Sequence, residues 1–256
     1  MYLGIDHLVL AVPDPDVAAL GLEQALGLAA TGGGRHPQLG TRNRLIFLGD
    51  SYLELVGLEE PARAGEHPLG GAVRAALEAG TPGLVSLALA APDLRGTVER
   101  LRQAGSPIGE PVAGERTRPD GRVVRWLAAF PPRLGPAEPP FLIEHELAGP
   151  EWGDEARASR AAQVHPFGGR ARLVGLELAV SDPAAVAADW DLAVGVPFVP
   201  GPGPDPLDRE ARVGEQAVRL VPPTAGDPPA RIGILGVDGG REHILVERFG
   251  CRFVRV

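Results

Sequence analysis

The chain has 256 residues and a formal net charge of −8, and 44% of its residues are apolar while 23% are charged. These values exclude a disordered chain and a helical membrane protein as the expected class, and the length allows one large domain or two ordinary ones. The sequence has no basic run of the kind that binds nucleic acid, and its single cysteine, Cys251, cannot form an internal disulfide. We therefore expect a cytoplasmic protein that binds neither nucleic acid nor membrane.

Three segments of the sequence resemble one another, and each predicts a strand that runs into a helix. They begin at Leu8, Leu87 and Leu176. Between strand and helix, each segment has an aspartate that suits a helix N-cap, because its carboxylate can accept bonds from the first free N–H groups of the helix. These aspartates are Asp14, Asp93 and Asp182. Because the same order recurs three times, an internal duplication is the simplest explanation.

Short apolar strands follow each predicted helix. Residues 44–58 predict two strands around the Gly49-Asp50 turn, and Pro119-Asp120-Gly121 marks a second turn. The segment from Gly214 matches the segment from Gly49 almost position for position. Each unit is thus predicted as a strand, a helix and two or three antiparallel strands. Proline and glycine at 61–70 indicate a loop or linker.

Side-chain alternation along the strands of the first copy places two polar residues on one face. If the leucines of each strand face the helix, His7 and Glu54 lie on the opposite, open face. An unpaired carboxylate is costly to bury, so Glu54 needs a metal ion, an arginine or solvent beside it. Histidine and carboxylate that converge on one cavity are an expected metal-binding pattern.

The second and third copies repeat this open face less completely. With Phe141 and Ile143 assigned to the packing face, Glu144 lies on the open face and His145 on the other one. The position that matches the histidine of the first strand is Ser86. The third copy has glycine and arginine at the two polar positions, which predicts a structural role there, such as covering a sheet edge or forming a homodimer.

The sequence resembles the vicinal oxygen chelate superfamily, which groups glyoxalases, bleomycin-resistance proteins and extradiol dioxygenases, and in particular its glyoxalase-like domains. The resemblance rests on IDHLVLAV, GGRHPQLGTRN, LGDSYLELV and RTRPDGRVVRW, and it covers roughly residues 4–148, with a weaker echo from 172 onward. It implies an α+β fold of repeated βαβββ modules that form cupped mixed sheets. The expected parts are two paired modules at 1–60 and 82–148, a linker at 149–170, and a third, degenerate module with a C-terminal hairpin at 171–256, turning at 238–240.

The resemblance also implies a set of site residues, because metal-using members take ligands from the first and last strands of each paired module. By position, His7, Glu54 and Glu144 would bind a divalent metal ion of unknown identity, with water completing its shell. Further candidates, for contact with the substrate, are His36, Thr41, Asn43, Ser86 and Arg125, of which His36 is also a possible replacement ligand. Arginines on a hairpin are, however, usually solvated or paired.

Two functions remain open from the sequence. The first is a metal-dependent glyoxalase-like enzyme, a lyase or isomerase that acts on a small oxygen-bearing molecule, with Glu54 or Glu144 as the group that moves the proton. Dioxygenase chemistry ranks lower, because it uses two histidines and one carboxylate as iron ligands, and only His7 matches a histidine position here. The alternative is a binding protein of the bleomycin-resistance type that holds a small molecule without turnover. A scaffold that pairs with another chain is a third and blander interpretation.

Overall fold

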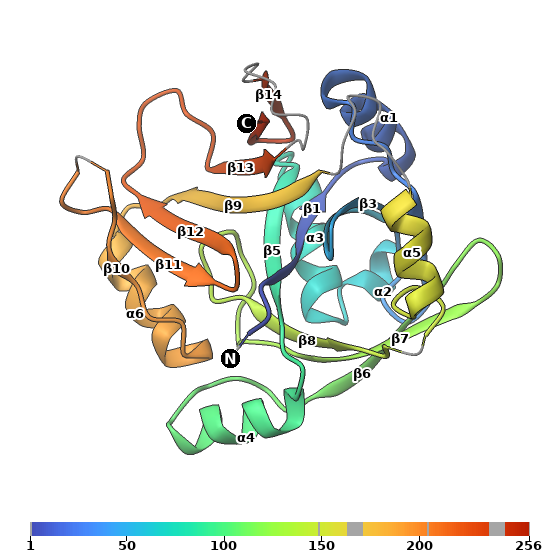
Figure 1. Ribbon diagram of the computed structural model, residues 1–256, viewed down its shortest axis with the longest axis horizontal. Coiled ribbons are helices and arrows are strands. Elements are labelled where there is room, and N and C mark those ends of the chain that lie inside the picture. Colours follow the sequence, from blue (N-terminus) through green and yellow to red (C-terminus); the bar gives the residue numbers. More distant parts are fainter. Residues whose placement is uncertain (1, 148, 163–170, 204, 236–243, 256) are drawn as a thin grey trace.

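The computed structural model describes residues 2–147, 149–162, 171–203, 205–235 and 244–255 (Figure 1). The first half contains β1 (Ile5–Ala11), α1 (Pro15–Leu26), β2 (Gly32–His36), β3 (Thr41–Leu48), β4 (Ser51–Leu58), α2 (Pro61–Ala64), α3 (Pro68–Glu78), β5 (Gly83–Ala90), α4 (Leu94–Gln103), β6 (Val112–Thr117), β7 (Val123–Ala129) and β8 (Phe141–His145). The second half contains α5 (Asp154–Ala162), β9 (Arg172–Ala179), α6 (Pro183–Val194), β10 (Val199–Pro200), β11 (Arg209–Val213), β12 (Gln216–Val221), β13 (Ala230–Leu235), β14 (Ile244–Arg248) and β15 (Cys251–Arg255).

The N-caps predicted for three helices are confirmed. Asp14 accepts hydrogen bonds from the backbone N–H groups of the first turn of α1, Asp93 does so for α4, and Asp182 does so for α6. These bonds satisfy donors that have no partner within the helix. The repeated aspartate therefore sets the point at which each strand gives way to its helix.

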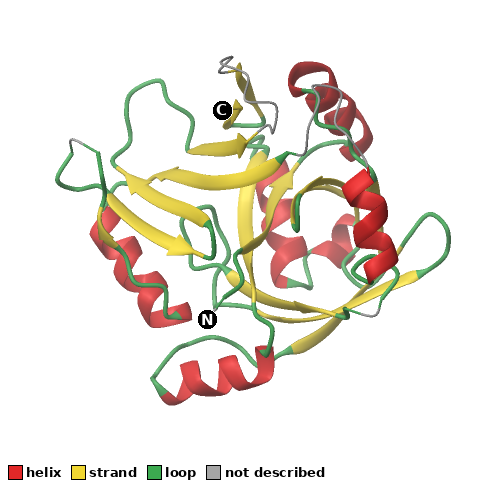
Figure 2. Ribbon diagram, viewed as in Figure 1, coloured by secondary structure: helices red, strands yellow, loops and turns green. Residues whose placement is uncertain are grey.

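The strands of the first two modules close into a barrel in the order β1-β4-β3-β2-β6-β7-β8-β5. β1 pairs in parallel with β4 of its own module and antiparallel with β5 of the next. The barrel is thus a mixed sheet of two βαβββ modules, and the predicted α+β fold class is confirmed. In Figure 2 the strands occupy the centre of the molecule, with α4 and α6 at its periphery.

A second sheet has the order β10-β11-β12-β9-β13-β15-β14. β9 pairs in parallel with β12 and antiparallel with β13, which repeats the pairing of β1. The expected hairpin around residues 238–240 would pair β13 with β14, but β14 forms its hairpin with β15. Residues 238–240 themselves lie outside the described part of the chain. β13 instead pairs in parallel with β15, as the first and last strands of a module do.

One apolar core joins the two sheets. The outward-facing leucines of β1, such as Leu8 and Leu10, pack in the same cluster as Trp190 of α6 and Phe253 of β15, and all four are buried. Burial of each large side chain in this cluster stabilises the fold by roughly 2 kcal/mol. The second sheet therefore covers much of the convex side of the barrel.

The predicted loop at 61–70 is wrong, because this segment forms α2 and the start of α3. Pro61 and Pro68 occupy the first turns of these helices, where a missing N–H costs nothing, and the side chain of His67 caps α3 by accepting from Leu69 N at 3.1 Å. α3 packs against β1, β4 and β5, and its Val73 is fully buried in the concave cluster. Among the described residues, no helix is long and apolar enough to cross a bilayer.

Candidate functional site

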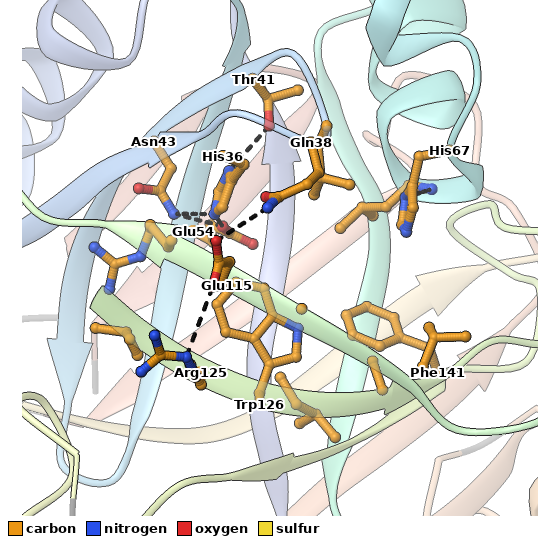
Figure 3. Close-up of a pocket in the computed structure, with 18 of the residues that line it drawn as sticks. His36, Gln38, Thr41, Asn43, Glu54, His67, Glu115, Arg125, Trp126 and Phe141 are labelled. Carbon is orange, nitrogen blue, oxygen red and sulfur yellow. Dashed lines mark hydrogen bonds and ion pairs between the residues drawn. The ribbon is translucent and has the colours of Figure 1, made fainter.

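A cavity of about 1040 Å³ lies inside the barrel, between α3 and the strands of both modules (Figure 3). Its wall contains the polar side chains of β1, β2, β3 and β4 together with further polar ones from β6, β7 and β8, whereas α3 contributes mainly apolar ones. The polar half of this wall is the candidate site.

Glu54 lies at the centre of the polar half, on β4, and only 6% of its surface is exposed. Its Oε1 accepts a hydrogen bond from Asn43 Nδ2 at 2.6 Å, and its Oε2 lies 3.6 Å from His7 Nε2. A carboxylate oxygen can only accept, so this contact fixes the orientation of the Asn43 amide, with its oxygen turned away from Glu54. That Asn43 oxygen is buried and has no hydrogen-bond partner within the described part of the chain.

His36 is held in one tautomer beside Glu54. Its Nδ1 lies 2.9 Å from Thr41 Oγ1, and its Nε2 faces the amide nitrogen of Asn43 at 3.5 Å, so Nε2 must be the acceptor and Nδ1 the donor. Burial lowers the pKa of His36 to about 4, and the nearby Glu54 opposes this only in part. His36 is therefore neutral near pH 7 and acts as a fixed dipole.

The depressed pKa of His36 predicts acid sensitivity. Between pH 6.5, its ordinary pKa, and about 4, the unfolded chain binds a proton that the folded chain refuses, so the free energy of unfolding falls as the pH drops through this window. The full difference is on the order of 3 kcal/mol. Denaturant unfolding of wild type and His36→Gln at pH 7 and pH 4.5 checks this, because the variant should lose less stability on acidification. An equal loss in both proteins would show that His36 titrates normally.

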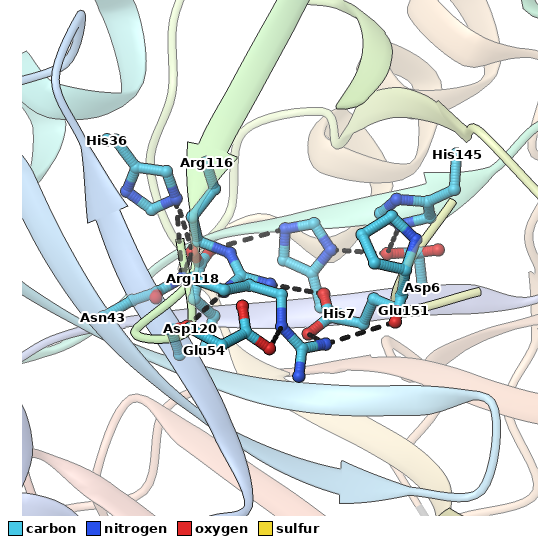
Figure 4. A network of polar contacts seen from close by, with 12 residues as sticks. Asp6, His7, His36, Asn43, Glu54, Arg116, Arg118, Asp120, His145 and Glu151 are labelled. Atoms are coloured by element: carbon cyan, nitrogen blue, oxygen red, sulfur yellow. Dashed lines mark hydrogen bonds and ion pairs between the residues drawn. The ribbon is translucent and has the colours of Figure 1, made fainter. Parts of the chain in front are cut away.

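A second hydrogen-bonded group continues from His7 to the end of the barrel (Figure 4). Asp6 Oδ1 lies 2.7 Å from His7 Nδ1 and 3.0 Å from His145 Nε2. Burial alone would raise the pKa of Asp6, but the two histidines hold it well below its usual range, so Asp6 is a carboxylate. Because Asp6 accepts from Nδ1 of His7, it directs Nε2 of that ring toward Glu54.

Residues 150–153 close this end of the barrel, although the sequence predicted a linker there. Trp152 stacks on His145 with ring centroids 4.3 Å apart, and Glu151 forms a buried ion pair with Arg116 of β6. Arg116 also donates to the backbone oxygen of Gly33, so it joins β2, β6 and the closing segment. The remaining helix of this segment, α5, ends at Ala162, and residues 163–170 lie outside the described part of the chain.

Glu144 lines the same cavity as His7 and Glu54, but its carboxylate is bonded elsewhere. The assignment of Phe141 and Ile143 to the packing face is wrong, because both lie in the concave cluster with Val9 and Ala11. The carboxylate of Glu144 instead accepts from Leu94 N, at the start of α4, at 2.9 Å. His145, which was assigned to the other face, belongs to the group around Asp6.

The predicted metal set is therefore not assembled. His7 and Glu54 provide two donors, the third predicted ligand caps a helix, and the Nε2 of His36 already faces an amide N–H. In the described ranges, no group of three or more histidine, cysteine or acidic side chains could hold a metal ion. The residues present do not fit the metal centre that the resemblance implied.

The other predicted contacts divide between the cavity and its surroundings. Thr41, Asn43 and His36 lie in the wall, as expected. Arg125 lies at the rim, with its side chain 60% exposed and 3.7 Å from Glu115. Ser86 pairs with Val9 in the register of β1 and β5 and is buried, and it does not line the cavity.

Four site residues were missed or rejected from the sequence: Asp6, His145, Glu151 and Trp152. The sequence carried one signal for Asp6. An acidic residue in an apolar strand needs a hydrogen-bond or ion-pair partner when the strand is buried, and a histidine follows it directly. Glu151 and Trp152 lie in a short segment between Pro150 and Gly153, and no sequence pattern there indicated that they would be buried.

Comparisons with known proteins agree with this fold. A family profile described as a glyoxalase-like domain matches residues 5–194. A segment of 166 residues, 61% of the chain, is 34% identical to the spectinabilin polyketide synthase system protein NorA of Streptomyces orinoci. The match spans only 7% of the length of that relative.

Solved structures resemble the chain at low sequence identity. A hypothetical protein from Staphylococcus aureus is 14% identical, with 98% of both chains covered and a TM-score of 0.76. Methylmalonyl-CoA epimerase from Mycobacterium tuberculosis is 21% identical, covers 56% of this chain and 88% of its own, and gives a TM-score of 0.43. The first of these likenesses shows that the whole arrangement of three modules and C-terminal strands occurs in another protein.

Proposed function

The chain belongs to the glyoxalase-like domain family, and we propose that it is a lyase or isomerase that moves a proton next to the carbonyl group of a small molecule held in the barrel. Glu54 carries this proposal. It is a buried carboxylate in a cavity wall, with one oxygen bonded to Asn43 and the other facing the ring of His7. A carboxylate whose position is fixed and whose second oxygen is free to accept has the requirements of a general base.

In the proposed reaction, Glu54 Oε2 takes the proton from the carbon next to the carbonyl. The electrons of that C–H bond form the C=C bond of an enol, and the carbonyl oxygen takes a proton from Nε2 of His7. Asp6 supports this role, because it bonds to Nδ1 of His7 and stabilises the charged ring before transfer. Return of the proton from Glu54 to a different position or face, while the enol hydroxyl gives its proton back to Nε2 of His7 and the C=O bond re-forms, completes an isomerisation; departure of a leaving group with its electron pair from the carbon next to the C=C bond, as the hydroxyl returns its proton to His7, completes a lyase reaction.

The substrate should carry a hydrogen-bond donor near the reacting carbon. The oxygen of Asn43 is buried and turned away from Glu54, and an unsatisfied acceptor of this kind costs about 1 to 3 kcal/mol until a partner arrives. A hydroxyl or N–H group beside the carbonyl would bond to it. We therefore propose small hydroxycarbonyl compounds as the substrate class.

Binding without turnover is the second candidate, and the second module favours it. The concave cluster contains Val85 and Ala88 of β5 and Phe141 of β8, and the polar residues of β8 that line the cavity already have partners, because Glu144 accepts from Leu94 N and His145 bonds to Asp6. Apolar walls with a few polar groups are normal for a binding pocket.

The wild-type protein in D₂O tests these candidates. We expect NMR spectra to show exchange of the proton next to the carbonyl in hydroxyketones or hydroxyaldehydes of a small panel, and not in matched ketones that lack the hydroxyl. The panel should include a hydroxyacyl thioester, because one relative is named as a polyketide synthase system protein. Compounds that raise the Tm without any exchange would favour the binding protein.

The same assay tests whether the chain's own groups suffice. We expect exchange to persist after prolonged treatment with a chelator and to be unchanged when divalent metal ions are added. Activity that disappears with the chelator and returns with a metal ion would overturn the acid–base roles assigned to Glu54 and His7.

A further inference from the structure

β1 contains a bulge immediately before His7. In its pairing with β5, Ile5 is opposite Leu89 while His7 is opposite Ala88, so two residues of β1 span one residue of β5. Ile5 consequently packs in the outer core, although simple alternation would place it on the same face as His7. A bulge of this kind changes the direction of the side chains around it, and here it brings the adjacent side chains of Asp6 and His7 into contact.

The backbone groups of Ile5 bind side chains where the bulge interrupts the ladder. Its N–H donates to Gln216 Oε1 at 3.0 Å, and its carbonyl oxygen accepts from Ser51 Oγ at 2.7 Å. Gln216 Nε2 in turn donates to Ser51 Oγ at 3.0 Å. Two side-chain hydrogen bonds thus hold Ile5, a third joins the two side chains that make them, and Gln216 of the third module takes part in two of the three.

The first and third modules approach each other closely beside Ile5. Gly4 has no room for a Cβ atom, which would overlap Gln216 Oε1. Gly214, in the turn before β12, likewise has no room, because a Cβ atom would overlap the carbonyl oxygen of Leu3. The turn of the third module is therefore fitted against the first strand: a larger residue at Gly214 would push the two backbones apart, and one at Gly4 would displace the end of the Gln216 side chain.

Ser51 and Gln216 occupy matching positions in their modules. Ser51 is the second residue after Gly49 and begins β4, and Gln216 is the second residue after Gly214 and begins β12. The first and third modules thus contact each other through corresponding residues, with the bulge of β1 between them.

We propose that Gln216 is a positioning residue for His7, so that the third module sets the geometry of the site in the first. Gln216 does not contact His7. It acts through the N–H of Ile5, because a bulge that loses this partner can slip into regular pairing, which would turn Asp6 and His7 onto opposite faces. Only the catalytic role of His7 in this inference rests on the proposed function; its positioning by Gln216 does not.

Gln216→Leu tests the inference by NMR, with Gln103→Leu on the exposed face of α4 as the matched control. In Gln216→Leu we expect the Ile5 amide to exchange with solvent about tenfold faster or more. We also expect the ring nitrogen signals of His7 to change as its bond to Asp6 is lost, while those of His36, held by Thr41 and Asn43, stay in place. Gln216→Glu keeps an oxygen for Ile5 and should retain most of the wild-type His7 signature.

The outcomes separate positioning from general packing. His7 signals that stay at their wild-type positions in Gln216→Leu would overturn the inference, and so would a matching change in His36, because both would then report a loosened barrel. If the wild type exchanges substrate protons, Gln216→Leu should lower kcat about tenfold with little change in KM. If the wild type shows no exchange with any compound, the proposed function fails, and the His7 signals still decide the role of Gln216.

Discussion

Replacing Glu54 by glutamine should lower the rate of substrate proton exchange at least about 100-fold, the usual contribution of a positioned general base. Glutamine has the same shape and can still accept from Asn43 through its amide oxygen, so the hydrogen bond at 2.6 Å has an acceptor in the variant. What disappears is the second carboxylate oxygen, which faces His7 at 3.6 Å. Exchange rates measured by NMR under saturating substrate give the ratio directly.

Glu144→Gln is the matched control for that experiment. Its carboxylate accepts from Leu94 N at the start of α4, and a glutamine oxygen can make the same bond, so exchange should stay within about twofold of the wild-type rate. Full activity in Glu54→Gln would remove the base from the proposed mechanism. Equal losses in both variants would indicate that the second module contributes to the chemistry.

The largest loss of stability is expected at Arg116. Arg116 and Glu151 are 3% and 5% exposed, and they join β6 to the segment that closes the barrel. Arg116→Met removes the principal cation from a buried carboxylate, which costs about 3 to 5 kcal/mol of unfolding free energy. Replacing both partners, as Arg116→Met with Glu151→Leu, should cost less than the single change, because no buried charge is left.

Urea unfolding of these variants gives the comparison, with Arg125→Met as the control. Arg125 lies on the neighbouring strand β7, is mostly exposed, and pairs with Glu115 at 3.7 Å, so its loss should cost under about 1 kcal/mol. A single Arg116 variant as stable as Arg125→Met would show that the ion pair adds little. If the double variant is less stable than Arg116→Met, the cost of the single change does not arise from leaving the Glu151 carboxylate buried without this cation.

The alternation of side chains was informative where the two faces of a strand differ in chemistry. In β1 and β4 the outward residues are leucines and the inward ones include His7 and Glu54, so the sequence indicated which face carries the site. In β8 the rule failed, because the concave side near β5 and α3 is itself apolar. Phe141 and Ile143 are buried there, at 2% and 4% exposure, and apolar character no longer distinguishes the two faces.

The residues that the sequence missed depend on features without a local signal. The pairing of Asp6 with His7 requires the bulge in β1, which is set by contacts with Gln216, more than 200 residues away in the chain. The burial of Trp152 and Glu151 depends on the open end of a barrel that exists only when both modules are assembled. Motifs and periodicity describe neighbours in sequence, and these contacts are between residues far apart.

The placement of α3 has a consequence for stoichiometry. A barrel built from two similar modules offers two related concave surfaces, and each could in principle receive a guest. Here the chain fills one of them itself, because Val73 of α3 packs against Val85 and Ala88 of β5. The segment that joins the two modules thus acts as a covalently attached occupant of part of the barrel, so the duplication does not leave two equivalent concave surfaces open among the described residues.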